Sequence, residues 1–266
     1  MNRFLKTIVP FFILSYTSSA YTNCDKTGLE VMKIQEKYHQ TASEKEFQSI
    51  TLKDLKSGST ENRDMQRTKK TVNSLSKSLI VFSSPSSIKG TALLSHEQNE
   101  RGDDQWLYLP ALRKTQRIAP SGKKNYFMGT DFTFADLEDE ALSQYDYSCK
   151  KLSKCGPDKC YLIEATPKNK RIVKDTGYSM RKLWVRNDTY VTVRIKYLDP
   201  KGNDLKTLTN SQWKKYGKTA WRPRKAVMKR PGLHQTTVLT KERKVDLPIS
   251  EEIFQERYLI KGMHLK

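Results

Sequence analysis

Four cysteines are the side chains of this sequence whose spacing most directly implies a chemistry. Cys155 and Cys160 enclose a Gly-Pro turn typical of a hairpin loop, and residues that flank such a loop face each other across two strands. Geometry therefore favours a disulfide bond between these two, which leaves Cys24 to pair with Cys149. A zinc site is the alternative, although the spacing differs from that of the common zinc motifs.

The other reactive side chains do not form a pattern typical of catalysis. The sequence has no Gly-x-Ser-x-Gly elbow, no His-Glu-x-x-His pair and no phosphate-binding glycine loop. Its histidines, none at a metal-ligand spacing, are His39, His96, His234 and His264. The neighbours Asp103 and Asp104 would point to opposite faces of a strand. We therefore expect no enzymatic activity, no catalytic residue, no metal and no cofactor.

The N-terminus has the three parts of a secretory signal. Arg3 and Lys6 are followed by an apolar run of nine residues, 8–16, and a small-residue cleavage motif ends at Ala20. The apolar run is too short to span a bilayer, which needs roughly 20 residues. We therefore expect a signal peptide over residues 1–20 and a soluble protein in the periplasm. A buried N-terminal helix is the alternative.

Length and charge restrict the organisation and the partners of the chain. The 266 residues contain no clear repeat or long linker, so residues 21–266 are expected to form a single domain. The net charge of +20 is spread along the chain and favours acidic partners. Anionic lipid headgroups fit an exported protein, whereas nucleic acid is not expected. The alternative is that the charge only keeps the protein in solution.

Helices are expected at a few places only. Residues 27–38 place Leu29, Met32, Ile34 and Tyr38 at the spacing of an amphipathic helix. Residues 130–137 combine capping and apolar residues, as a short helix would, and Ser250 is a candidate cap for residues 251–255.

Short strands are expected through most of the remaining chain. In residues 190–197 the side chains of Val191, Val193, Ile195 and Tyr197 share one face. Further strands are expected over residues 78–83, 91–94, 106–109, 145–152, 160–166, 221–228 and 236–243, near Ile50, Leu52 and Met65, and at Trp213. This succession predicts a mainly β protein of the α+β type, with a large curved antiparallel sheet or open barrel.

Several segments together resemble the LolA-like outer-membrane lipoprotein-sorting family. They are Trp106-Leu107-Tyr108-Leu109-Pro110, residues 129–137, residues 161–167, Leu183-Trp184-Val185, and Asp246-Leu247-Pro248 before Phe254. The resemblance covers residues 89–258. The sequence departs from the family pattern in the cysteine group Cys149, Cys155 and Cys160 and in residues 55–75, which are rich in Lys, Ser and Asn.

The resemblance implies an incomplete barrel whose concave side is covered by a few short helices. The space between sheet and helices would be an apolar cavity for acyl chains, because each methylene exposed to water costs about 0.8 kcal/mol. Candidate cavity residues are Leu79, Val81, Trp106, Tyr108, Phe132, Phe134, Leu183, Val193 and Ile195. For each of these residues the alternative is a place in an ordinary core.

The implied function is that of a monomeric periplasmic carrier. It would bind the acyl chains of a lipid or lipoprotein and pass them towards the outer membrane, together with an inner-membrane exporter of the resistance-nodulation-division type. The alternative is a periplasmic sensor or regulatory binding module of envelope stress.

Overall fold

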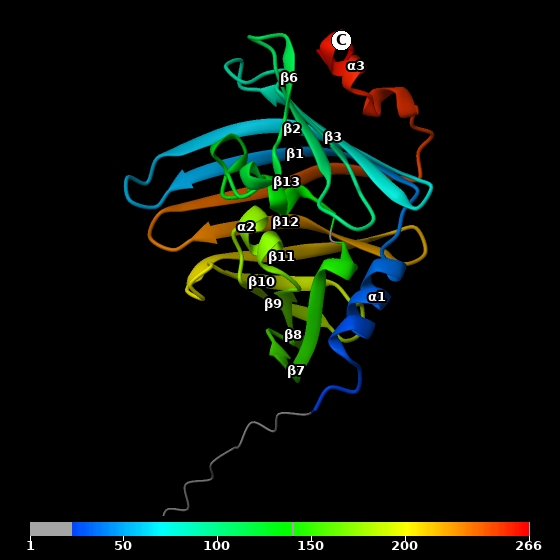
Figure 1. The fold of residues 1–266 in the computed structure, drawn as a ribbon, viewed down its shortest axis with the longest axis vertical. Helices are drawn as coiled ribbons and strands as arrows, with labels where there is room; N and C mark the ends of the chain where they lie inside the picture. Colours follow the sequence, from blue (N-terminus) through cyan, green and yellow to red (C-terminus); the bar gives the residue numbers. More distant parts are fainter. Residues whose placement is uncertain (1–22, 140, 266) are drawn as a thin grey trace, which may run out of the picture.

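The computed structural model describes residues 23–139 and 141–265, so the expected signal peptide over residues 1–20 lies outside the described residues. The described chain forms a 13-stranded antiparallel sheet in the order β6-β5-β4-β3-β2-β1-β13-β12-β11-β10-β9-β8-β7 (Figure 1). The edge strands β6 and β7 stand at opposite ends of this order. The sheet is therefore open, and the predicted mainly β, incomplete-barrel architecture is confirmed.

Two consecutive meanders make up the sheet. The first contains β1 (Ser43–Asp54), β2 (Thr60–Val72), β3 (Leu75–Ser84), β4 (Ala92–His96), β5 (Asp104–Leu109) and β6 (Lys114–Arg117). The second contains β7 (Tyr145–Cys155), β8 (Asp158–Pro167), β9 (Met180–Arg186), β10 (Thr192–Leu198), β11 (Asp204–Tyr216), β12 (Ala220–Arg230) and β13 (His234–Val245). Antiparallel pairing of β1 with β13 joins the two meanders into one sheet.

Short helices occupy the segments before, between and after the meanders, and one lies within the second meander. They are α1 (Gly28–Tyr38), η1 (Pro120–Gly122), η2 (Phe127–Gly129), η3 (Phe134–Leu137), η4 (Leu142–Gln144), α2 (Lys170–Thr176), η5 (Glu251–Phe254), α3 (Glu256–Ile260) and η6 (Met263–Leu265). We call residues 120–139 the plug segment and residues 249–265 the C-terminal segment. None of the helices in the described ranges has the length and apolar character needed to cross a membrane.

The sheet has two differently covered faces, because successive side chains on a strand point to opposite sides. On β3, Ile80 and Phe82 face the plug segment, and Phe82 stacks on Phe127 at a ring-centroid distance of 5.6 Å. Leu79 packs instead against the C-terminal segment, around Phe254. We call the side that contacts the plug segment and α1 the inner face and the other side the outer face.

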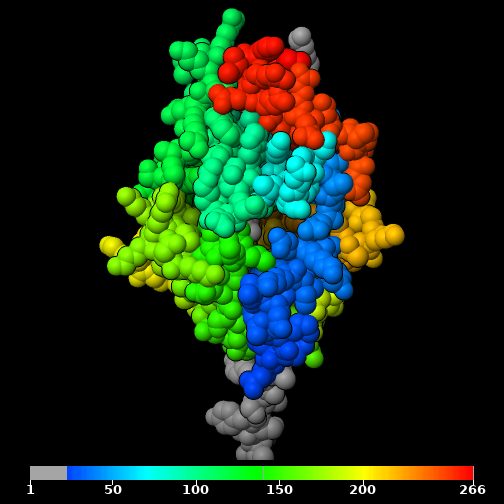
Figure 2. All heavy atoms as spheres, turned by 45° about the vertical axis from the view of Figure 1, so that its right-hand side comes forward, coloured from blue at the N-terminus to red at the C-terminus, as the bar shows by residue number. Residues whose placement is uncertain are grey.

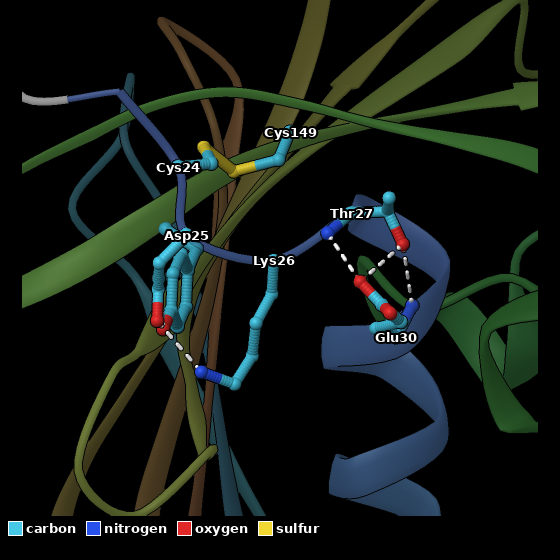
Figure 3. The surroundings of a disulfide bond; sticks show 7 residues. Cys24, Asp25, Lys26, Thr27, Glu30 and Cys149 are labelled. Carbon is cyan, nitrogen blue, oxygen red and sulfur yellow. Dashed lines mark hydrogen bonds and ion pairs between the residues drawn. A yellow bond between two sulfur atoms is a disulfide. The ribbon is translucent and has the colours of Figure 1, made fainter.

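The N-terminal helix forms where it is predicted, but it buries a different set of side chains. Thr27 and Glu30 form a capping box at its start (Figure 3). Gly28 lies against β7, where an added Cβ would come within 2.7 Å of the Tyr147 backbone. The buried residues are Val31 and Met32, whereas Leu29 and Tyr38 are 38% and 46% exposed. Helical spacing alone does not say which side of α1 meets the sheet.

Most predicted strands are confirmed, with two informative differences. The polar strand β2 extends through residues 60–72, inside the region that matches the family pattern poorly. Its side chains show little apolar alternation because Arg67 and Lys69 lie on the inner face. In β10 the pairing with β9 is irregular between Thr192 and Arg194, so Val193 interrupts the predicted alternation.

Both disulfide bonds favoured by the sequence are present. Cys24 is bonded to Cys149 with a Cα–Cα distance of 6.2 Å (Figure 3). Cys155 is bonded to Cys160 with a Cα–Cα distance of 5.8 Å. The first bond fastens the start of α1 to β7, and the second closes the β7–β8 hairpin. Because all four sulfur atoms are in these bonds, the thiolates that the zinc alternative requires are consumed.

Removal of the two disulfides should have unequal effects on stability. The Cys24–Cys149 bond closes a sequence separation of 125 residues and the Cys155–Cys160 bond one of 5. Loop entropy then predicts that replacing the first pair by alanine lowers the free energy of unfolding by about 5 kcal/mol, and the second pair by about 2 kcal/mol. Urea unfolding of the two double variants tests this order, and a larger loss for the hairpin pair would contradict it.

Candidate functional site

A cavity of about 600 Å³ lies between the inner face, the plug segment and α1. The molecular surface is hollowed between the blue α1 and the cyan strands of the first meander (Figure 2). We call this cavity the inner pocket. Its size is within the range of roughly 300–1,000 Å³ that is usual for ligand sites.

One end of the inner pocket is apolar. The strands contribute the side chains of Ile50, Met65, Ile80, Ala226 and Val238, and the plug segment contributes Phe127, Phe132 and Leu137. Ile50 and Val238 face each other directly across the β1–β13 pairing. The apolar end is therefore made by both meanders at the point where they join.

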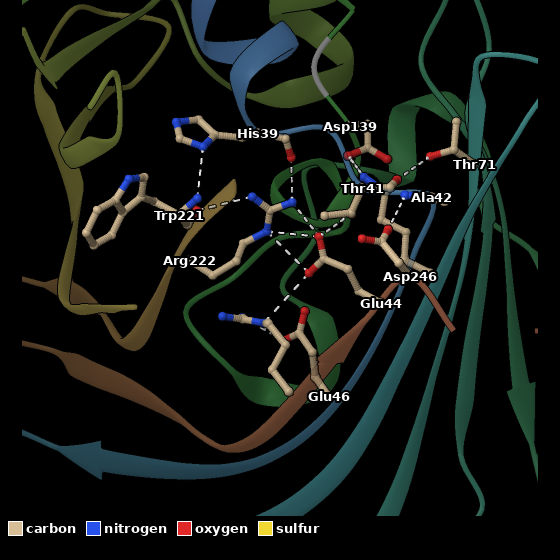
Figure 4. Close-up of polar contacts among 12 residues, drawn as sticks. His39, Thr41, Ala42, Glu44, Glu46, Thr71, Asp139, Trp221, Arg222 and Asp246 are labelled. Atoms are coloured by element: carbon tan, nitrogen blue, oxygen red, sulfur yellow. Dashed lines mark hydrogen bonds and ion pairs between the residues drawn. The ribbon is translucent and has the colours of Figure 1, made fainter. Parts of the chain in front are cut away.

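The other end of the inner pocket is charged. Glu44 on β1 accepts hydrogen bonds from Arg222 on β12, with an Nε–Oε1 distance of 2.9 Å, and from the Thr41 hydroxyl at 2.7 Å (Figure 4). Arg222 also donates to the carbonyl oxygen of His39 at 2.6 Å, which ties the end of α1 to the sheet. Burial alone would raise the pKa of Glu44, but the charge and hydrogen bonds of Arg222, together with the Thr41 hydroxyl and the charge of Arg243, lower this pKa below its ordinary value.

A buried lysine on β11 holds the plug segment. Lys206 is 1% exposed, and its ammonium group donates to the Asp136 carboxylate and, at 3.0 Å, to the Asp131 carbonyl oxygen. Burial lowers the pKa of Lys206, and Asp136 acts in the opposite direction. The ammonium group also lies 5.2–5.3 Å from the ring centroids of Tyr126, Tyr178 and Tyr197.

Other polar contacts fix the backbone of the plug segment to the two meanders. The Thr236 hydroxyl on β13 donates to the Asp131 carboxylate at 2.8 Å and accepts from the Asp131 N–H at 2.8 Å. Gln105 on β5 is fully buried and donates to the Phe134 carbonyl oxygen at 3.1 Å. These contacts connect the backbone of the plug segment to strands of both meanders and give it a defined position.

A second cavity, of about 820 Å³, lies on the opposite side of the plug segment. Asp136, Glu138 and Asp139 line both cavities and so form the wall between them. Burial, together with the nearby charges of Glu138 and Asp139, raises the pKa of Asp103 in the second cavity to about 8. Its neighbour Asp104 has a lowered pKa because Arg101 binds it.

Four of the predicted cavity residues lie on the outer face of the sheet. Leu79, Val81, Trp106 and Tyr108 belong to the outer-face cluster that packs against Phe254 and Leu259 of the C-terminal segment. The sequence shows that these side chains alternate along their strands with side chains of the opposite face. It does not show which of the two faces meets the plug segment. The residues Ile80 and Phe82 on β3 and Leu107 on β5 occupy the inner-face positions instead.

The other five predicted residues are divided among different environments. Phe132 lines the inner pocket and Ile195 lines the second cavity. Phe134 is in the core beneath the plug segment, and Leu183 is in the core beneath α1. Val193 is half-buried at the irregularity of β10 and lines neither cavity.

The charged residues of the inner pocket are absent from the sequence-based prediction. They include Glu44, Glu46, Arg67, Lys69, Arg222 and Arg243. Alternating charges on a strand are usually taken as a solvated face, and only the pairing of β2, β1, β13 and β12 shows that these side chains converge. In the described parts of the chain, no group of three His, Cys, Asp or Glu side chains could hold a metal ion.

Breaking the buried pair should be costly for stability. In Lys206→Met the Asp136 carboxylate remains buried without its cation, so the free energy of unfolding should fall by about 3–5 kcal/mol. Adding Asp136→Asn should recover part of this loss. Lys196→Met, which breaks the more exposed pair with Asp204, is the control and should cost less than about 1 kcal/mol. Equal losses in urea unfolding for the two single variants would contradict the assigned role.

The raised pKa of Asp103 should make stability depend on pH. The pKa of Asp103 is about 8 in the folded state, whereas its ordinary value, which applies to the unfolded chain, is 3.8. Between these two pH values the folded state therefore binds more protons than the unfolded state. Stability therefore declines as pH rises through this window, by up to about 1.4 kcal/mol per pH unit. Urea unfolding between pH about 5 and about 8 should show a shallower decline for Asp103→Asn than for the parent protein. Asp104→Asn is the control and should leave the slope unchanged; the same slope in all three proteins would contradict the assignment.

Comparison with solved structures shows the same fold in several bacterial proteins. A domain from Vibrio parahaemolyticus, assigned to the outer membrane lipoprotein-sorting proteins, has 27% sequence identity and a TM-score of 0.82 over 88% of this chain and 98% of that domain. A DUF1329 family protein from Desulfovibrio piger has 26% identity and a TM-score of 0.81 over 87% of this chain and 97% of its own. A LolA superfamily protein from Nitrosomonas europaea shares the fold at 16% identity, with a TM-score of 0.68 over 88% of this chain and 99% of its own.

Sequence comparison identifies the family. No curated protein matches the chain. A family model with the description "uncharacterized protein" matches residues 74–261, which is more than half of the sequence. The chain therefore belongs to this family, and it shares its LolA-like fold with the lipoprotein-sorting domain and the LolA superfamily protein.

Proposed function

We propose that the protein is a periplasmic carrier that holds the acyl chains of a lipid or lipoprotein in the inner pocket. The observation that carries this proposal is the apolar end of the pocket, where side chains from both meanders face the phenylalanines of the plug segment. An acyl chain placed there would be removed from water, at a gain of about 0.8 kcal/mol for each methylene. The likeness to lipoprotein-sorting proteins supports the same ligand class.

The proposed location and partners follow from this role. Residues 1–20 would direct export and be removed, and residues 21–266 would act in the periplasm as a single domain. The two disulfide bonds are consistent with an oxidising compartment. We propose that an inner-membrane exporter supplies the cargo, that the outer membrane receives it, and that the carrier is a monomer. Ligand binding, rather than catalysis, is the proposed activity.

A bulkier side chain in the inner pocket should weaken the binding of acyl chains. Ala226 on β12 lines the apolar end, so Ala226→Phe should exclude about two methylenes and weaken acyl-chain binding about tenfold. Its neighbour Val227 lies on the outer face of the same strand, and Val227→Phe is the matched control.

Native mass spectrometry of protein purified gently from the periplasm measures the fraction that carries lipid. We expect bound lipid in the parent protein and in Val227→Phe, and a strongly reduced fraction in Ala226→Phe. A parent protein that stays free of lipid after incubation with phospholipids and acylated peptides would overturn the proposed function.

A further inference from the structure

Arg67 is the cation of the inner pocket that is left without a partner of its own. It lies on the inner face of β2, where its direct neighbours across the sheet are Glu46 on β1 and Ile80 on β3. Its Nε atom is buried and has no hydrogen-bond partner. Within residues 23–139 and 141–265, Arg67 makes no hydrogen bond or ion pair.

The carboxylates nearest to Arg67 are already bound by other groups. Glu46 accepts from Arg243, with an Nη2–Oε2 distance of 3.1 Å, and from the Gln48 amide at 2.5 Å. Asp139 accepts from Lys69 at 2.6 Å and from the Ser76 hydroxyl. Burial alone would raise the pKa of Asp139, but Lys69 and, more weakly, Arg67 lower it below its ordinary value. Arg67 thus interacts with the charge of Asp139 at a distance, but its N–H groups donate no hydrogen bond to that carboxylate.

The position of Arg67 relative to the apolar end defines a ligand shape. Met65, two residues earlier on the same face of β2, lines the apolar end together with Ile80, the cross-strand neighbour of Arg67. A ligand with an acyl chain against Met65 and Ile80 would therefore place its headgroup at Arg67. A guanidinium group donates two parallel hydrogen bonds to a phosphate or carboxylate, and such charge-assisted bonds are about twice as strong as neutral ones.

Acidic residues at the mouth limit the charge of that headgroup. Glu36 on α1 and Glu97 after β4 line the pocket near Asp139. Burial and the negative charges of Glu97 and Asp139 raise the pKa of Glu36, so these carboxyl groups give their part of the pocket a negative field. This field would repel a headgroup with several negative charges, whereas a single oxyanion bound by Arg67 would be tolerated.

We propose that Arg67 is the headgroup site of the inner pocket and selects amphiphiles with a single oxyanion, a phosphodiester or a carboxylate, next to the acyl chain. This proposal rests on the proposed function, because it assigns the ligand class of the same pocket. Leaving the buried Nε–H of Arg67 without an acceptor costs free energy, so a ligand that supplies the missing acceptor should gain the equivalent of one charge-assisted hydrogen bond, or about tenfold in affinity.

The test compares two ligands with the same palmitoyl chain, lysophosphatidylglycerol and neutral monopalmitoylglycerol, by titration of the mature protein. We expect the parent protein to bind the anionic lipid about tenfold more tightly. Arg67→Met should bind both lipids equally, because the anionic lipid loses the guanidinium partner that the neutral lipid does not use. Arg67→Lys should keep part of the preference, and Gln66→Met, on the outer face of the same strand, should keep all of it.

The outcomes separate this proposal from the proposed function. Equal binding of the two lipids by the parent protein, or an undiminished preference in a folded Arg67→Met variant, would overturn the headgroup site and leave the acyl-chain carrier intact. Binding of neither lipid would overturn both. Inorganic phosphate is the third probe: if it binds as tightly as lysophosphatidylglycerol, the ligand is free phosphate and the assignment to a lipid headgroup is wrong.

Discussion

The buried contact between Lys206 and Asp136 is the interaction on which the architecture of the site depends. An open sheet leaves its inner face exposed unless other segments cover it, and here the cover is α1 together with the short 3-10 helices of the plug segment. A charge with almost no exposed surface is stable only when it is paired and hydrogen-bonded. Lys206 meets this condition through Asp136 and the Asp131 carbonyl oxygen, and in doing so it fixes the plug segment above β11.

The position of the plug segment decides what the inner face becomes. Where the plug packs directly on strands, as Phe127 does on Phe82, the result is an ordinary core. Where it stands away from β1, β2, β12 and β13, a pocket remains with an apolar end and a charged end. The charged end is held together by Glu44 and Arg222, which also connect it to the end of α1 through His39 (Figure 4). A pocket with two such ends suits an amphiphile better than a purely apolar molecule.

The sequence predicts the sheet more completely than the pocket, for a physical reason. The apolar run in residues 78–83 predicts β3, and the Gly-Pro turn between Cys155 and Cys160 predicts a hairpin, because both signals are local. The choice of inner face is not local. Leu79 and Ile80 are equally apolar, and only the distant C-terminal and plug segments determine which of them meets the pocket. For the same reason Arg67 resembles a solvated strand residue until its neighbours across the sheet are known.

The most direct test of the central claim is to locate the bound acyl chain. A phospholipid with a diazirine at the end of its palmitoyl chain is loaded onto the mature protein and activated by light, and the modified peptides are identified by mass spectrometry. If the inner pocket is the acyl-chain site, the adducts should fall on the plug segment around Phe132 and on inner-face residues such as Met65 and Val238. Adducts confined to the C-terminal segment and the outer-face residues that it covers, such as Trp106, would contradict the account.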